Sequence, residues 1–121
     1  MVDETRTVLI VDDDHHILDL SEDVMQKSYT VIRADNGRAA VDAFRAHDHI
    51  DLVLLDLGMP EMSGYEALAE FQIVEPDVKV SVVTGMNPEH DQLPGILGVL
   101  PKPFQAQQIS TAVEEALGAY S

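Results

Sequence analysis

Side chains that can bind a cation or a phosphoryl group stand at the ends of four apolar runs in this chain. They are Asp12 and Asp13 after residues 7–11, Asp56 after residues 52–55, Thr84 after residues 78–83, and Lys102 shortly after residues 98–100. Carboxylates bind hard cations, and a carboxylate can also act as a nucleophile toward a phosphoryl group. Ammonium and hydroxyl groups can stabilise the phosphoryl oxygens. These residue types therefore predict phosphoryl chemistry at a metal site.

The carboxylates predict a magnesium site. Carboxylates a few ångströms apart raise one another's pKa values unless a cation lies between them. Mg²⁺ takes one or two protein carboxylates, keeps several water molecules and often binds phosphate oxygens. The expected ligands are Asp13, Asp56 and the backbone carbonyl of Gly58, with Asp12 acting through a water molecule. Three carboxylates, Mg²⁺ and Lys102 sum to zero charge, so the site can accept a dianionic phosphoryl group.

Asp56 is the expected nucleophile because it is a single carboxylate after a central, continuously apolar run. Its attack on a phosphoryl group would give an acyl phosphate. The terminal oxygens of that group would be stabilised by Mg²⁺, by Lys102 and by the hydroxyl of Thr84.

Each of these residues also has an ordinary structural interpretation. Asp after a strand is often a helix cap, and we favour that role for Asp14. A lysine before a proline is usually a surface residue, and a threonine after an apolar run usually belongs to the strand. Ligands of open α/β sheets bind beyond the carboxyl ends of the strands, so four such placements together favour a site.

The chain between these positions predicts an α/β domain with a parallel sheet. Short Val, Leu and Ile runs alternate with segments of helical period, which is typical of a doubly wound fold with helices on both faces. The apolar positions of the helical segments are Ile17, Leu20 and Val24; Val41 and Phe44; Leu68 and Phe71; and Ile109, Val113, Ala116 and Leu117. Together with the four apolar runs named above, a run at residues 30–32 gives five expected strands.

Helix-capping residues agree with this division. Asp14 can cap the first helix, the segment Asp35-Asn36-Gly37 opens the second, and Ser63 with Glu66 has capping-box spacing for the third. Residues 87–98 contain two prolines and two glycines, so any helix there spans at most two turns.

Composition narrows the function further. The 121 residues carry 22 acidic and 7 basic side chains, a formal net charge of −15, and no cysteine. We expect one domain over residues 1–121, without disulfides, thiolate chemistry or cysteine metal sites. So few Lys and Arg residues argue against direct binding to nucleic acid or to an anionic membrane. With no apolar stretch long enough to span a bilayer and no signal peptide, we expect a cytoplasmic location.

The motifs resemble the receiver (response-regulator) domain of two-component signalling. The resemblance covers the whole chain, and its most specific part runs from Asp56 to Gly64. The matching segments read Val8-Leu9-Ile10-Val11-Asp12-Asp13-Asp14, Leu54-Leu55-Asp56-Leu57-Gly58-Met59-Pro60-Glu61-Met62-Ser63-Gly64, Thr84-Gly85 and Lys102-Pro103-Phe104.

This resemblance implies a flavodoxin-like fold with strand order 2-1-3-4-5 and a cis bond between Lys102 and Pro103. It implies phosphorylation of Asp56, a Mg²⁺ pocket that includes Asp12 and Asp13, and phosphoryl contacts from Thr84 and Lys102. It also implies a histidine kinase or phosphotransfer protein as donor and a protein partner that reads the output.

Three departures from the family pattern stand out. Valine occupies position 99, where receivers usually carry a Tyr or Phe that rotates on activation. The interval from Thr84 to Lys102 is short for the family, which suggests a reshaped output face. Gly58 and Met86, two residues beyond Asp56 and Thr84, have no polar side chain to position a hydrolytic water. We therefore predict slow self-catalysed dephosphorylation, which a phosphoryl lifetime of seconds would contradict.

Other residues carry weaker expectations. Leu18 and Met25 fall off the apolar stripe formed by Ile17, Leu20 and Val24, and receivers commonly bind their kinase through this helix, so they are candidate partner contacts. The paired histidines at 15–16 and those at 47 and 49 are expected at the surface rather than as metal ligands or phosphohistidines.

Three functions remain open on the sequence alone. The first is the phosphoryl-accepting switch, which acts on itself and is no turnover enzyme. The second is a receiver-like interaction module that does not use phosphate. The third is a phosphatase of the haloacid dehalogenase type with Asp12 as nucleophile and Asp14 as acid/base. Such enzymes need a later acidic pair to hold Mg²⁺, and the only later acids are Glu114 and Glu115.

Overall fold

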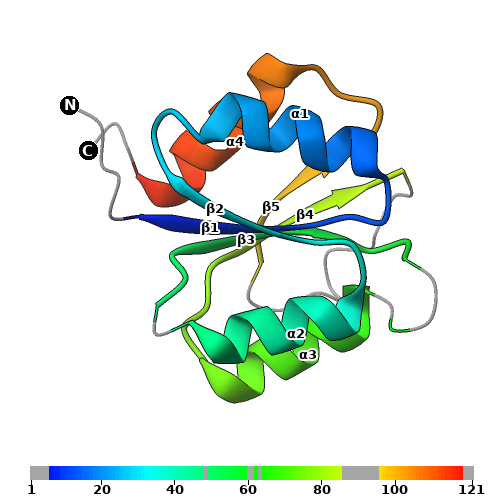
Figure 1. Ribbon diagram of the computed structural model, residues 1–121, viewed down its shortest axis with the longest axis vertical. Helices are drawn as coiled ribbons and strands as arrows, with labels where there is room; N and C mark the ends of the chain where they lie inside the picture. The colour runs from blue at the N-terminus through cyan, green and yellow to red at the C-terminus, as the bar shows by residue number, and fades with distance from the viewer. Residues whose placement is uncertain (1–5, 48, 60–61, 63, 86–95, 119–121) are drawn as a thin grey trace.

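The described part of the chain forms a five-stranded parallel sheet between two layers of helices (Figure 1). This computed structural model describes residues 6–47, 49–59, 62, 64–85 and 96–118. In chain order the elements are β1 (Thr7–Val11), α1 (His15–Met25), β2 (Thr30–Ala34), α2 (Gly37–Ala46), β3 (Leu52–Asp56), α3 (Gly64–Val74), β4 (Val80–Thr84), β5 (Ile96–Pro101) and α4 (Ala106–Leu117).

The strand order β2-β1-β3-β4-β5 confirms the predicted doubly wound fold. β3 and β4 are buried along their whole length, and β1 along all but its first residue. This explains why residues 8–11 and 52–55 are continuously apolar. The edge strands β2 and β5 are partly exposed.

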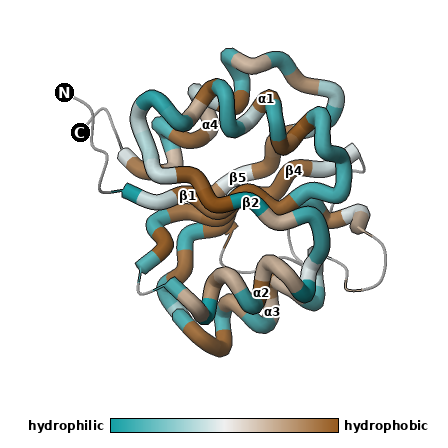
Figure 2. Tube along the Cα trace, in the orientation of Figure 1, coloured by the Kyte–Doolittle hydropathy of each residue, from teal (hydrophilic) through white to brown (hydrophobic). Residues whose placement is uncertain are grey.

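Two hydrophobic clusters hold the layers together, one on each face of the sheet. α2 and α3 cover one face, where the rings of Phe44 and Phe71 lie 4.9 Å apart between their centroids. α1 and α4 cover the other, with Ile109, Val113 and Leu117 of α4 fully buried. Figure 2 shows the hydrophobic strands enclosed by helices of mixed polarity.

The predicted helix starts at Asp14 and within Asp35-Asn36-Gly37 are confirmed, and Asn36 is the capping residue of the second. The Asp14 side chain accepts a hydrogen bond from the backbone N–H of His16, and the Asn36 side chain accepts one from Ala39. Ser63, the predicted cap of α3, lies outside the described residues.

β5 differs from its prediction. It begins at Ile96, two residues earlier than expected, and a β-bulge lies where Val80 pairs with Ile96 and Ser81 pairs with Gly98. Ile96 to Gly98 therefore belong to a strand, and the rest of the segment predicted as a short helix lies outside the described residues, as does Met86. None of the helices in the described part has the length and apolarity needed to cross a bilayer.

Candidate functional site

Asp12 and Asp56 lie next to each other because their strands are neighbours in register. Val11 of β1 pairs with Leu55 of β3, so the residue that follows each of them emerges at the same edge of the sheet. Asp12 is 2% exposed and Asp56 is 4% exposed. Two carboxyl groups are thus held largely out of water at the carboxyl end of the sheet.

The side chain of Asp12 is held by one backbone contact and one side-chain contact. Its Oδ1 accepts a hydrogen bond of 2.9 Å from the backbone N–H of Asp14, and its Oδ2 lies 2.9 Å from Nζ of Lys102. Burial raises the pKa of Asp12 from 3.8 to about 6, and the charge of Asp56 adds to this. The hydrogen bonds from Asp14 and Lys102 oppose the rise without cancelling it.

Asp56 accepts a hydrogen bond of 3.0 Å at Oδ1 from the backbone N–H of Gly58, and its Oδ2 lies 3.4 Å from Nζ of Lys102. The start of α3 packs directly on the backbone of this residue. A Cβ atom at Gly64 would overlap the carbonyl oxygen of Asp56 and the Cα of Leu57. Glycine at the first position of α3 therefore lets the helix approach the end of β3 this closely.

Lys102 reaches both carboxylates from the end of β5. Its backbone N–H donates a 2.8 Å hydrogen bond to the carbonyl of Thr84, which keeps the ends of β4 and β5 together. The Lys102–Pro103 bond is cis, as the resemblance implied. Burial disfavours the charge of Lys102, but the hydrogen bond and charge of Asp12, with the charge of Asp56, outweigh it and raise the lysine pKa. The lysine therefore stays protonated between the carboxylates.

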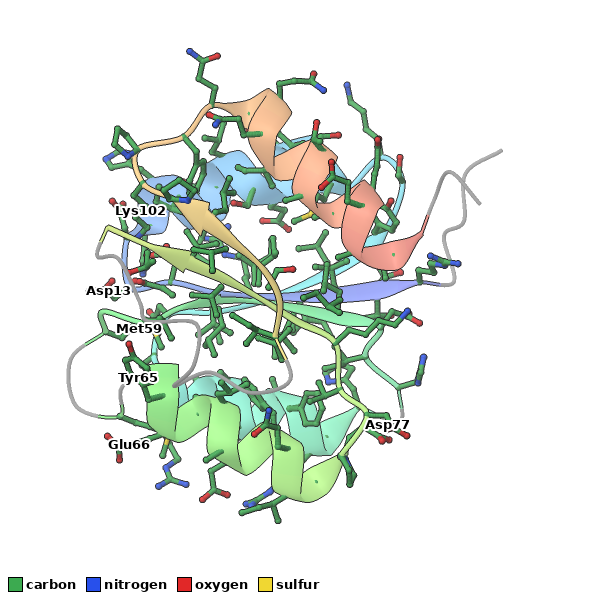
Figure 3. The ribbon with its side chains drawn as sticks, turned by 180° about the vertical axis from the view of Figure 1, so that it is seen from behind. Asp13, Met59, Tyr65, Glu66, Asp77 and Lys102 are labelled. Atoms are coloured by element: carbon green, nitrogen blue, oxygen red, sulfur yellow. The ribbon has the colours of Figure 1, made fainter. Side chains whose placement is uncertain are left out.

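Thr84 is the last residue of β4 and pairs with Pro101 of β5. It is 1% exposed. The strand ends thus bring Asp12, Asp56, Thr84 and Lys102 to one edge, as the placement after apolar runs predicted. Figure 3 shows Asp13 and Lys102 on this side of the molecule.

The donor set at this edge fits a hard divalent cation. One carboxylate oxygen each from Asp12, Asp13 and Asp56 lie within 4.8 Å of one another, and Asp13 is exposed while the other two are buried. These oxygens are the ligands that Mg²⁺ prefers. Lys102 supplies one positive charge against three negative ones, so a cation would relieve the remaining repulsion.

Sequence reasoning missed the backbone donors. The N–H groups of Asp14 and Gly58 hold the two buried carboxylates, and no side-chain pattern reveals them because almost every residue has this group. Gly64 did carry a signal, since a glycine at a helix start often marks close backbone approach.

The prediction that Leu18 and Met25 are candidate surface contacts is wrong. They are 2% and 1% exposed and belong to the cluster between α1, the sheet and α4. The central line of the buried face of α1 is Leu18, Ser21 and Met25, whereas Ile17, Leu20 and Val24 are half-buried beside it. Because the central buried position is the small polar Ser21, the prediction placed the buried stripe one residue too early along the helix.

The four histidines predicted at the surface, at positions 15, 16, 47 and 49, are exposed. Nε2 of His15 lies 3.0 Å from Asp35 and Nε2 of His49 lies 2.7 Å from Asp51, and both rings are mostly exposed. Asp35, which follows β2, has its pKa lowered by the hydrogen bond from His15.

The later acids that a dehalogenase-type phosphatase needs do not join the carboxylate cluster. Glu115 lines a groove with Leu97 and Gly98 at the beginning of β5, whereas Lys102 follows the other end of that strand. Within the described residues, the metal-ligating cluster is made of Asp12, Asp13 and Asp56 alone. The structure gives no support to the phosphatase hypothesis.

Comparison with known proteins points in one direction. The family model described as "Response regulator receiver domain" matches residues 8–114. The chemotaxis protein CheY of Bacillus subtilis is 30% identical over 116 residues, covering 91% of this chain and 96% of CheY. Sporulation initiation phosphotransferase F of the same species is 34% identical over 116 residues, covering 91% and 92%. The sensor kinase CckA of Brucella abortus is 34% identical over 119 residues, which span 93% of this chain but 13% of that kinase.

Solved structures agree with the sequence matches. A CheY-like receiver domain protein from Methanospirillum hungatei superposes with a TM-score of 0.86 at 25% identity, covering 96% of both chains. The response regulator TrrA of Thermotoga maritima, solved in complex with Mg²⁺-BeF, gives a TM-score of 0.83 at 27% identity, covering 93% of this chain and all of TrrA.

Proposed function

We propose a function for this chain from its family, since it belongs to the response regulator receiver domains. In this proposal the domain is a signalling switch in which Asp56 accepts a phosphoryl group from a phosphohistidine. Receiver domains act as signalling switches rather than as turnover enzymes. The donor would be a histidine kinase or a phosphotransfer protein. The similarity to a segment of the sensor kinase CckA and to a sporulation phosphotransferase supports this class of partner.

The observation that carries the proposal is the position of Lys102 between two buried carboxylates. Its Nζ lies 2.9 Å from Asp12 and 3.4 Å from Asp56. A structural lysine would need one partner, and a site for a cation and a phosphoryl group needs an ammonium beside several carboxylates. Asp13 adds a third carboxylate within 4.8 Å of the others.

In the proposed transfer, an Oδ atom of Asp56 attacks the phosphorus of the donor. The new P–O bond forms as the P–N bond to the donor imidazole breaks, and the imidazole leaves with the bonding electrons and takes up a proton. The Gly58 N–H already donates to Oδ1 of Asp56, which fixes the orientation of the carboxylate. Oδ2, on the side of Lys102, is the proposed attacking atom.

Mg²⁺, held by Asp13, Asp56 and the Gly58 carbonyl with Asp12 as an indirect ligand, would neutralise the charge on the transferred phosphoryl oxygens when bound. The chain's own contributions are orientation and charge. Lys102 donates to a phosphoryl oxygen in place of its contact with Asp56, and the Thr84 hydroxyl binds another. Burial of Asp12 and Asp56 strengthens these electrostatic interactions relative to water.

The signal would arise because phosphorylation changes what Lys102 and Thr84 contact. Thr84 ends β4 and Lys102 directly follows β5, and the Lys102 N–H donates a hydrogen bond to the Thr84 carbonyl. A dianionic group on Asp56 therefore favours an arrangement of these strand ends that is less populated in the unphosphorylated protein. A protein partner binds the two arrangements with different affinities, and this difference transmits the signal.

A phosphate-independent interaction module is the second candidate. Val99 of β5 favours it, because this position lacks an aromatic side chain that could rotate with Thr84. The intact set of Asp12, Asp56 and Lys102, in which the lysine contacts both carboxylates, favours the phosphoryl switch instead.

Incubation with acetyl phosphate and Mg²⁺ tests the proposal. Intact-mass measurement should find one phosphoryl group on the wild-type chain and on Asp42→Asn, a matched change of an exposed acid on α2. The adduct should be absent from Asp56→Asn and from samples with excess chelator. An adduct that survives Asp56→Asn, or none with any phosphodonor, would overturn the proposed function.

A further inference from the structure

A second concave surface lies at the edge of the sheet opposite the carboxylate site. It is a hollow of about 490 Å³ beside the end of α3 and the turn that leads into β4. Edges of the core residues Phe44, Ile50 and Val78 form its floor together with Val74. Asp77, at the rim, lies on the side of the molecule away from Asp13 and Lys102 (Figure 3). The proposed phosphoryl chemistry does not use this hollow.

The outward face of α3, whose last residue Val74 lines the hollow, exposes several apolar side chains. Ile73 is 74% exposed and Val74 is 43% exposed. Tyr65, Ala69 and Ile73 recur every four residues and are all exposed, so they form a stripe opposite the buried Ala67, Leu68 and Phe71. A helix with one buried face ordinarily carries polar residues on the other. Exposed apolar side chains bordered by polar residues, here Glu66 and Glu70 of the same helix, are typical of interaction sites.

The charges around the hollow are mainly negative. Asp51, Glu75 and Asp77 carry carboxylates at its rim, with His49 bonded to Asp51 and Lys79 as the cation among its lining residues. On α3 itself, Glu70 is paired with Arg45, and the last turn has no basic residue. The carbonyl end of a helix has a partial negative charge that a cation would neutralise. The rim therefore attracts positively charged groups.

We propose that the hollow and the adjoining Ile73 and Val74 form a docking surface for an amphipathic helix of a partner protein that presents an apolar side chain beside Lys or Arg. The apolar side chain would enter the hollow over Phe44 and Val78. The neighbouring cations would face Glu75, Asp77 and the carbonyl end of α3. Helix-in-groove recognition uses this combination of apolar anchors and flanking charge.

This surface would act independently of the phosphoryl site. The two lie at opposite edges of the sheet, and the described residues that line the hollow do not include Asp12, Asp56 or Lys102. Docking there is therefore expected to hold the domain near a partner whether or not Asp56 is phosphorylated. The inference survives failure of the proposed function, because binding can be measured in Asp56→Asn.

A synthetic helical peptide with leucines on one face and flanking lysines is the probe. Titration into ¹⁵N-labelled protein should shift backbone resonances of α3 residues 70–74 and of residues 75–79, equally in wild type and Asp56→Asn. Ile73→Ser should weaken binding about ten-fold, because it removes an exposed apolar contact without disturbing the core. Leu97→Ser, which removes an apolar side chain that is 51% exposed elsewhere, should leave the affinity unchanged.

Two further peptides separate docking from general attraction to an acidic protein. A peptide with glutamates in place of the lysines should bind at least ten-fold more weakly, and so should one with serines in place of the leucines. Equal binding of the serine peptide, or resonance shifts centred on other residues, would overturn the proposal. Self-association of the free protein that Ile73→Ser abolishes would assign the surface to a second copy and would also overturn it.

Discussion

One ammonium serves two buried carboxylates at the centre of the site. Nζ of Lys102 is closer to Asp12 than to Asp56, at 2.9 Å against 3.4 Å, and Asp13 adds a third negative charge nearby. Burial raises the pKa of Asp12, and the negative charge of Asp56 adds to the rise. The site is therefore strained electrostatically until a cation, a proton or a rearrangement of Lys102 relieves it.

The first prediction concerns pH. The pKa of Asp12 is 3.8 when exposed and about 6 in the fold, so the folded state holds its proton more tightly. This tighter proton binding adds on the order of 3 kcal/mol to the free energy of unfolding below about pH 4. The contribution is lost as the pH rises through about 6. In metal-free protein, Asp12→Asn should therefore become increasingly more stable than wild type between pH 4 and 7. Urea unfolding across that range, with chelator present, checks this; a constant difference would contradict it.

Saturating Mg²⁺ should remove most of this pH dependence, because a bound cation favours the ionised carboxylate. Affinity for Mg²⁺ should correspondingly weaken as pH falls below about 6. The same unfolding experiment repeated with Mg²⁺ provides the comparison.

The second prediction concerns Lys102→Met, which keeps the length of the side chain and removes its charge. The initial rate of phosphorylation by acetyl phosphate should fall roughly 100-fold, because a group that stabilises the phosphoryl oxygens is lost. Affinity for Mg²⁺ should stay the same or increase, since a competing cation leaves the carboxylates. Lys79→Met, at an exposed position on the opposite edge, is the control for loss of one positive charge. Loss of both Mg²⁺ binding and phosphorylation would indicate a purely structural lysine.

At the scale of the elements, the face of α1 on which a partner contact was predicted is buried in the core. Leu18 and Met25 pack against the sheet and α4. Spacing alone could not identify this line, because five large apolar residues occupy adjacent positions on two neighbouring stripes and the central position is Ser21. Only the docking angle of the helix decides which stripe faces the sheet.

The third prediction follows from this packing. Leu18→Ala should lower the free energy of unfolding by about 2–5 kcal/mol, because it leaves a cavity between α1 and α4. Leu97→Ala, at a largely exposed position, should change it by less than about 0.5 kcal/mol. Urea titrations of both variants provide the test. A stable Leu18→Ala protein with a defect confined to transfer from a kinase would restore the partner-contact hypothesis.

The α/β fold could be predicted from the alternation of apolar runs and helical segments, and the shared location of the four strand-end residues follows from the parallel sheet. Parallel strands end at one edge, so whatever follows each apolar run is brought there regardless of detail. The bulge at the start of β5 could not be predicted, since it depends on how Ile96 and Gly98 pair with β4. The N–H donors of Asp14 and Gly58 depend on backbone direction, which composition and spacing do not encode.

At the scale of the whole molecule, the net charge of −15 exceeds what the site requires. Three carboxylates belong to the cluster of Asp12, Asp13 and Asp56, and much of the remaining excess lies on exposed surfaces. Arg33 bridges Asp19 and Glu22 between β2 and α1, and Arg45 binds Glu70 between α2 and α3. The 22 acidic side chains outnumber the 7 basic ones about three to one, so the folded state carries self-repulsion.

The fourth prediction concerns salt. Raising KCl from about 0.1 M to about 1 M should increase the melting temperature by several degrees, because screening weakens repulsion among exposed carboxylates. A variant with Asp23→Asn and Glu115→Gln, both at exposed positions, should depend less on salt. Calorimetry at each concentration provides the comparison. A melting temperature that is flat or falls with salt would show that surface repulsion does not limit stability.

The most direct test of the central claim is to locate the phosphoryl group. Protein treated with acetyl phosphate and Mg²⁺ is reduced with borohydride, which converts an aspartyl phosphate into homoserine, and is then mapped by peptide mass spectrometry. The account predicts homoserine at position 56 and at no other aspartate. A phosphoryl group on His15 or His16, homoserine at Asp12 or Asp13, or an unmodified chain would contradict it.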